Sequence, residues 1–275
     1  MKKSFSIWSA FDIDASPEET VDRLAERGIT ECELSDEHGA MLLEREGTPE
    51  AIGSSFRAYA AKKNVTFPQG HLFLRVRLCD PATKPVETLS RWIRLFGAIG
   101  IRNAVLHPDY RTFAKDAPME DMIEQNAAVL KQLVPVAEQC GVRICLENMR
   151  VRFGAVKDLL ALIARVDSSA LGICLDTGHL NIAHTDSQRD FILAAGDKLH
   201  AMHLADNEGE NDQHMMPFGR GNVDFVSVFR TLDEIGYDGL LNYEIPGERC
   251  PLELRAAKTA YVRRINEYLL GTIGK

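Results

Sequence analysis

The 275-residue sequence lacks several features that mark common protein classes. It has six cysteines but no C-x-x-C pair, and four of them stand in strongly apolar segments, so we expect reduced thiols. The most apolar stretches, such as residues 159–166, meet charged residues long before the ~20 residues that a membrane helix requires. No secretory signal precedes Asp12 and Asp14. These absences predict a soluble, cytoplasmic protein without membrane contact.

Two further absences concern ligands. Neither G-x-G-x-x-G nor G-x-x-x-x-G-K-[ST] occurs, which argues against an open doubly wound sheet that binds nucleotides. Positive charge is also in the minority, because 32 Lys and Arg residues stand against 40 Asp and Glu residues, for a net charge of −8. An acidic chain is poorly suited to broad contact with phosphate backbones. We therefore do not expect nucleic acid as a partner.

Short β-like runs alternate with longer stretches of helical period along the whole chain, and no linker interrupts them. The predicted strands are Phe5–Ser9, Thr30–Leu34, Thr66–Leu72, Asn103–His107, Arg143–Glu147, Leu171–Asp176, Leu199–Leu204 and Leu241–Glu244. The predicted helices include Pro17–Arg27, Met119–Cys140 and Pro251–Leu270. Eight units of roughly 34 residues suit the repeat of a closed (β/α)₈ barrel. We predict the α/β class and a single TIM-barrel domain over residues 1–275.

Polar residues with metal-binding or acid–base side chains end six successive predicted strands. They belong to the strings Gln69-Gly70-His71, Leu106-His107-Pro108, Leu146-Glu147-Asn148, Leu175-Asp176-Thr177-Gly178-His179, His203-Leu204-Ala205-Asp206 and Asn242-Tyr243-Glu244. Because the carboxyl ends of barrel strands meet at one mouth, we expect these side chains to converge there. Cys145 shares a strand face with Glu147, and Cys174 with Asp176, so small residues should lie inside the barrel beneath both carboxylates.

Three carboxylates and one imidazole among these residues form a candidate metal site. The four residues are Glu147, Asp176, His203 and Glu244. Each alone would more often be a hydrogen-bonded structural group, so the prediction depends on all four together. Buried carboxylates in close company must share protons or bind a cation. This oxygen-rich set suits one Mn²⁺, Mg²⁺ or Co²⁺ ion at least as well as Zn²⁺.

Several strings together resemble a known family. The strings are LEN, CLDTGH, HLAD with a following D-x-H and P-x-G-x-G turn, and YEIP. Together they resemble the sugar phosphate isomerase/epimerase superfamily of xylose isomerase-like TIM barrels. The resemblance runs from about Trp8 to the last strand. The ordered set of motifs is far more specific than any one of them.

The resemblance implies a metal-dependent sugar or sugar phosphate epimerase or isomerase that transfers protons through a metal-stabilised enediolate. In ketose 3-epimerases of this superfamily one ion, usually Mn²⁺, is held by residues that match the four named above. Glu147 and Glu244 would also be the catalytic groups that exchange protons with substrate carbon, and His179 would bind a substrate oxygen. One departure concerns Gly209, which stands where those epimerases carry an arginine. Substrate identity therefore does not carry over.

The same superfamily includes apurinic endonucleases with three zinc ions. This chain matches their nine ligands in order: His71, His107, Glu147, Asp176, His179, His203, Asp212, His214 and Glu244. A multi-zinc phosphodiesterase is therefore an alternative function, although the acidic balance speaks against a DNA groove. In a sugar enzyme, five of the nine are candidates for substrate binding or an additional metal: His71, His107, His179, Asp212 and His214.

The long irregular stretch Ala205–Asn222 is expected to be functional. Its end resembles a turn of pentulose-phosphate 3-epimerases, where Arg220 could pair with a phosphate or carboxylate, and a plain turn is the alternative. Trp8, Phe73 and Phe218 could wall a pocket, with core or lid packing as the alternative. The expected partner is a small-molecule sugar or sugar phosphate. Two alternative functions are a keto-inositol-type dehydratase and a non-catalytic sugar-binding barrel. A homo-oligomer is also possible from the sequence.

Overall fold

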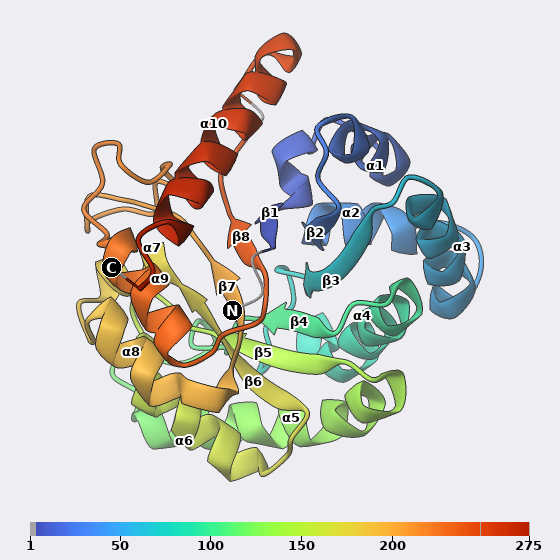
Figure 1. The fold of residues 1–275 in the computed structure, drawn as a ribbon. Coiled ribbons are helices and arrows are strands. Elements are labelled where there is room, and N and C mark those ends of the chain that lie inside the picture. The colour runs from blue at the N-terminus through green and yellow to red at the C-terminus, as the bar shows by residue number, and fades with distance from the viewer. Residues whose placement is uncertain (1–3, 248, 275) are drawn as a thin grey trace.

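The computed structural model describes residues 4–247 and 249–274, within which strands lie inside a ring of helices (Figure 1). The strands are β1 (Phe5–Ile7), β2 (Glu31–Leu34), β3 (Thr66–His71), β4 (Asn103–Leu106), β5 (Arg143–Glu147), β6 (Leu171–Asp176), β7 (Leu199–His203) and β8 (Leu241–Tyr243). The α-helices are α1 (Pro17–Glu26), α2 (Asp36–Leu43), α3 (Pro49–Lys62), α4 (Pro85–Ile99), α5 (Met119–Cys140), α6 (Val156–Val166), α7 (Thr177–Ala183), α8 (Gln188–Ala195), α9 (Phe225–Glu234) and α10 (Leu252–Leu270). Short 3₁₀ helices are η1 (Ser9–Asp12), η2 (Pro81–Thr83) and η3 (Gly196–Lys198).

The strands form a closed parallel barrel. Strands β2 to β7 pair in chain order, and β1 pairs with β8. Leu204 joins β7 to β8, because its N–H donates to the Asn242 carbonyl (2.8 Å) and its own carbonyl accepts from the Glu244 N–H (3.2 Å). On the other side, the Cys32 thiol of β2 donates to the Ile7 carbonyl of β1 at 2.9 Å. The predicted TIM barrel is confirmed.

Local sequence signals explain where the helices begin and end. Ser16 caps α1 through a capping box with Glu19, and Pro17 fills the first position, where no N–H bond is needed. Helix α5 spans the predicted Met119–Cys140 and ends at Gly141, whose φ of 64° suits glycine. Helices α1 and α10 each differ from the predicted bounds by one terminal residue. The helical predictions are therefore confirmed.

Five predicted strands were one or two residues too long at their carboxyl ends, and one of them is β7, which Leu204 follows. The residues after β1 turn into η1 at Ser9 rather than continuing the ladder. His107 follows β4, and the next residue, Pro108, has no N–H to donate to a neighbouring strand. Leu72 and Glu244 likewise follow their strands. These departures release the strand-end side chains into the barrel mouth.

The inner layer of the barrel is built from small residues. Val105, Cys145, Cys174 and Ala201 come from four successive strands and form a fully buried cluster of their own. This cluster confirms the predicted alternation, in which the next inward residue on β5 and β6 is a carboxylate. No helix in the described residues has the length and apolar composition needed to cross a membrane.

Candidate active site

The four predicted metal ligands converge at the barrel mouth. His203 Nδ1 lies 3.3 Å from Glu244 Oε2, 3.5 Å from Glu147 Oε1 and 3.9 Å from Asp176 Oδ2. Asp176, His203 and Glu244 are all buried and offer ligand atoms within 4.8 Å of one another. Four side chains from β5 to β8 therefore face a common point.

Two buried atoms at this point have no hydrogen-bond partner among the described residues: Asp176 Oδ2 and His203 Nδ1. The other Asp176 oxygen accepts from the His179 backbone N–H at 2.7 Å. Buried polar atoms are rarely left unpaired without a functional reason. A divalent cation would satisfy both atoms, so the donor set fits a metal ion.

A buried hydrogen-bond chain orients the His203 ring. His203 Nε2 donates to Glu33 Oε2 at 3.0 Å, which leaves Nδ1 directed at the carboxylates. Gln69 Nε2 donates to the same Glu33 oxygen. The sequence analysis missed Glu33 altogether. The sequence signal that could have identified it is a carboxylate one residue before the end of β2. The structure buries this carboxylate completely.

Three histidines surround Glu147. The Nε2 atoms of His107 and His71 lie 3.0 Å and 3.3 Å from Glu147 Oε2, and His179 Nδ1 lies 3.1 Å from Oε1. Asn148, the next residue, holds β6 in place by accepting from the Asp176 N–H at 2.7 Å. Glu147 thus links the candidate metal ligands to the histidines of β3 and β4.

The long loop after β7 delivers Asp212 and His214 to the same site. Asp212 Oδ2 lies 3.2 Å from His179 Nε2 and 3.3 Å from Arg150 Nη1, while Asp212 Oδ1 lies 3.3 Å from His214 Nε2. The His214 ring stacks on Trp8, with 6.1 Å between centroids and 7° between planes. All nine residues of the predicted constellation therefore meet in one place.

Comparison with known proteins places the chain in a family. Residues 17–265 match the model of the xylose isomerase-like TIM barrel family. The chain belongs to this family. It is 28% identical to the L-ribulose 3-epimerase of Mesorhizobium japonicum over 67% of this chain and 61% of that protein. It is 27% identical to the ketose 3-epimerase of Arthrobacter globiformis over 60% of this chain and 57% of that protein.

A solved structure shows the same fold of the xylose isomerase-like family. The D-psicose 3-epimerase of Clostridium cellulolyticum superposes with a TM-score of 0.80 at 19% identity, over 98% of this chain and 99% of that one. In sequence, the chain spans only 57–61% of the length of the first curated relatives it matches. These matches establish the family and the fold.

Charge is unevenly distributed over this family member's carboxylates. Burial raises the pKa of Glu244 to about 7, although His203 and His214 favour its charged form. Burial also disfavours the charged form of Glu147, but His107 and His203 outweigh it and hold the pKa of Glu147 well below its usual range. The site therefore pairs one firmly ionised carboxylate with one whose pKa suits proton transfer near neutral pH.

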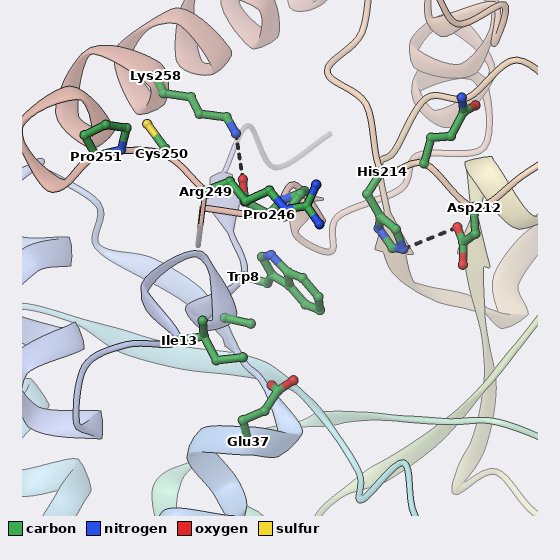
Figure 2. A pocket seen from close by; sticks show the side chains of 12 residues that line it. Trp8, Ile13, Glu37, Asp212, His214, Pro246, Arg249, Cys250, Pro251 and Lys258 are labelled. Carbon is green, nitrogen blue, oxygen red and sulfur yellow. Dashed lines mark hydrogen bonds and ion pairs between the residues drawn. The ribbon is translucent and has the colours of Figure 1, made fainter.

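A pocket of about 730 Å³ opens beside His214 and Asp212 (Figure 2). Trp8 forms part of its wall, as the sequence suggested, and Lys258 of α10 lies at its far side. The volume falls within the ~300–1,000 Å³ typical of small-molecule sites. This pocket is therefore large enough for a whole monosaccharide.

Three candidates from the sequence lie outside both this pocket and the cluster of ligand-type side chains around Glu147 and His203. Arg220 pairs with Glu208 at 2.7 Å, and 80% of its side chain is exposed. Phe218 contacts Tyr268 at the surface, and Phe73 stacks on Trp92. The structure does not bring Arg220 to the site because its own loop supplies a nearer carboxylate. The plain-turn alternative describes this segment.

The P-x-G-x-G turn still matters for the loop that carries Asp212 and His214. Asp206 begins this loop, and its Oδ1 accepts from the N–H groups of Asn207 (2.9 Å) and Val223 (3.1 Å). The two ends of the loop are thereby tied together. Gly221 packs against the same carboxylate, because a Cβ placed there would lie 2.1 Å from it.

Gly221→Ala should lower the free energy of unfolding by about 1–3 kcal/mol, since the added methyl group displaces the Asp206 carboxylate. Urea unfolding measures the loss. Gly219→Ala is the matched control, because its Cβ meets only the Met216 carbonyl, at 3.4 Å. We expect the control to stay within about 0.5 kcal/mol of the natural protein. Equal losses in both variants would contradict the role of Gly221.

Proposed function

We propose that the protein is a divalent-metal-dependent sugar epimerase that acts on a ketose. The observation that carries this proposal is the convergence of three buried carboxylates on His203 Nδ1, an atom without a hydrogen-bond partner in the described structure. The relatives named ketose 3-epimerase and L-ribulose 3-epimerase support the reaction class. Gly209 stands where the resemblance to ketose 3-epimerases implies an arginine, which argues for a substrate of different shape or charge.

The residues that would hold the cation are Glu147, Asp176, His203 and Glu244. Their hard oxygen-rich donors favour Mn²⁺, with Co²⁺, Mg²⁺ and Zn²⁺ as alternatives. When bound, the cation would stabilise negative charge on the substrate's carbonyl oxygen and so acidify the neighbouring C–H bond. The Glu33 carboxylate would keep the His203 ring in the orientation that this requires.

Glu147 and Glu244 are the proton-transfer groups in this proposal. One carboxylate removes the proton from the carbon next to the carbonyl, and the other returns a proton to the opposite face, which inverts that carbon. Burial raises the pKa of Glu244 to about 7 without a cation, and a bound cation would lower it. His179 would bind a substrate oxygen in this proposal, and the Asn148 carbonyl, 3.0 Å from its Nδ1, supports the orientation of its ring.

Deuterium exchange tests the proposal. In D₂O the Mn²⁺-loaded protein should place deuterium on the carbon beside the ketose carbonyl and form the epimer at that carbon. Treatment with a chelator should abolish both, and added Mn²⁺ should restore them. Free and phosphorylated ketoses should both be tried. If none exchanges with the metal-loaded protein, the proposed function is wrong.

One observation favours a second candidate, a multi-zinc phosphodiesterase. His71, His107 and Glu147 form a further set of ligand atoms within 4.8 Å, as do Glu147, Asp176 and His179. The metal content of protein purified without added ions separates the two functions within the same experiment. One ion per chain supports the epimerase, whereas three firmly held zinc ions would support the phosphodiesterase.

A further inference from the structure

A second pocket, of about 200 Å³, lies on the side of the candidate active site that is opposite the pocket beside His214. His107 lines it, and the same imidazole lies 3.0 Å from Glu147, so the pocket opens directly beside the proposed proton-transfer groups. Three arginines line it as well: Arg75, Arg77 and Arg111. We call this cavity the arginine pocket. In a chain of net charge −8, this cavity is lined by three arginines and one carboxylate.

These arginines are not used for ion pairs. Across residues 4–247 and 249–274, no carboxylate lies within ion-pair distance of Arg75, Arg77 or Arg111. Many other arginines do have such partners, for example Arg94 with Glu50 at 3.6 Å. The guanidinium of Arg111 lies instead over the Tyr110 ring, with 5.8 Å to the centroid. Their hydrogen-bonding edges are therefore available to an anion.

The pocket is held together by the one acidic residue among its described lining, Asp109. Asp109 Oδ2 accepts from the Cys79 N–H at 2.9 Å, and Oδ1 accepts from the Arg111 N–H at 2.9 Å. This buried carboxylate thereby fixes the β3–α4 loop, which carries Arg75 and Arg77, against the β4–α5 loop. Thr112 Oγ1 donates to Oδ2 at 2.6 Å, so both oxygens are occupied. Asp109 therefore holds the two loops of the pocket together, and three arginines outnumber its one negative charge there.

Strand order shows how the two pockets are related. The arginine pocket is formed by the loops after β3 and β4, whereas the larger pocket lies near β1 and β8, on the opposite side of the barrel. The arginine pocket adjoins the carboxylates through His107, and the larger pocket adjoins them through Asp212 and His214. Because about 200 Å³ is below the ~300–1,000 Å³ of whole-ligand sites, the arginine pocket suits a single terminal group.

We propose that the arginine pocket binds the anionic terminal group, a phosphate or a carboxylate, of the ketose substrate. Guanidinium groups match both anions through paired, charge-assisted hydrogen bonds. This inference rests on the proposed function, since it names the substrate class of the same site.

Kinetics with matched substrates test this inference. A free ketose, its terminal phosphate and its terminal carboxylate are compared with the metal-loaded natural protein and the double variant Arg77→Gln/Arg111→Gln. The double variant should raise KM for the anionic substrates by about 10- to 100-fold, because two charge-assisted contacts are lost. For the free ketose, KM should change less than threefold. Whichever anion shows the larger effect identifies the terminal group.

Arg94→Gln is the control, since it removes one exposed arginine of α4 that pairs with Glu50. It should leave every KM unchanged. Equal losses for free and anionic ketoses in the double variant would overturn the inference while the proposed function stood. Inorganic phosphate provides a readout that does not need turnover, and calorimetry should show binding that the double variant weakens at least tenfold. Absence of arginine-dependent binding of both inorganic phosphate and a small carboxylate, or arginine-dependent binding of an abasic DNA duplex alone, would also overturn it.

Discussion

Glu244→Gln should lower kcat for epimerisation by about 10²- to 10⁴-fold, the usual contribution of a general acid or base. Glutamine cannot carry the proton, but its carbonyl oxygen can still face the cation, so metal should remain bound. Glu147→Gln should have an effect of the same size. Steady-state kinetics with metal analysis of each purified variant checks both expectations.

Deuterium exchange gives these two variants a sharper signature. If the two carboxylates act on opposite faces, each single variant should still exchange slowly with one epimer, and that epimer should differ between the variants. Glu267→Gln is the matched control, because it removes a carboxylate from an exposed ion pair with Arg264 on α10. Normal epimerisation by either site variant would contradict their roles.

The sequence predicted the barrel because strand alternation, helix caps and βα spacing are local signals. Helix α1, with Ser16 and Glu19, and helix α5, with Gly141, were readable from a few neighbouring residues. The carboxyl ends of the strands were less predictable. Where a strand stops depends on the next turn, as at η1, and that turn is shaped by contacts from elsewhere in the chain.

The residues of the candidate site also differ in whether the sequence could predict them. The residues that end strands could be predicted, since barrel geometry brings all strand ends to one mouth. Glu33 could not, because its role depends on which ring nitrogen of His203 it meets across the barrel, 170 residues later. The arginine pocket was equally hidden. It exists because Asp109 ties together two loops whose sequences show no sign of contact.

Glu33→Gln should weaken binding of the metal ion by about 10- to 100-fold, as is usual when the partner of a metal-binding histidine is changed. The Glu33 carboxylate accepts the His203 Nε2 proton at 3.0 Å, which directs Nδ1 at Asp176, Glu147 and Glu244. An amide can accept the same bond, but it has no negative charge to favour this arrangement. Titration of the metal-free variant with Mn²⁺ measures the change in affinity.

Excess metal separates orientation of the ring from a purely structural effect. At saturating Mn²⁺ the variant should recover most of its kcat, because Glu147 and Glu244 remain in place. Glu31→Gln, on the same strand two residues earlier, makes the same change of charge and should keep the natural affinity. A Glu33→Gln protein that melts at a lower temperature but binds Mn²⁺ normally would show that the buried carboxylate supports only the barrel. Weak binding that excess metal overcomes would instead establish that Glu33 acts through His203.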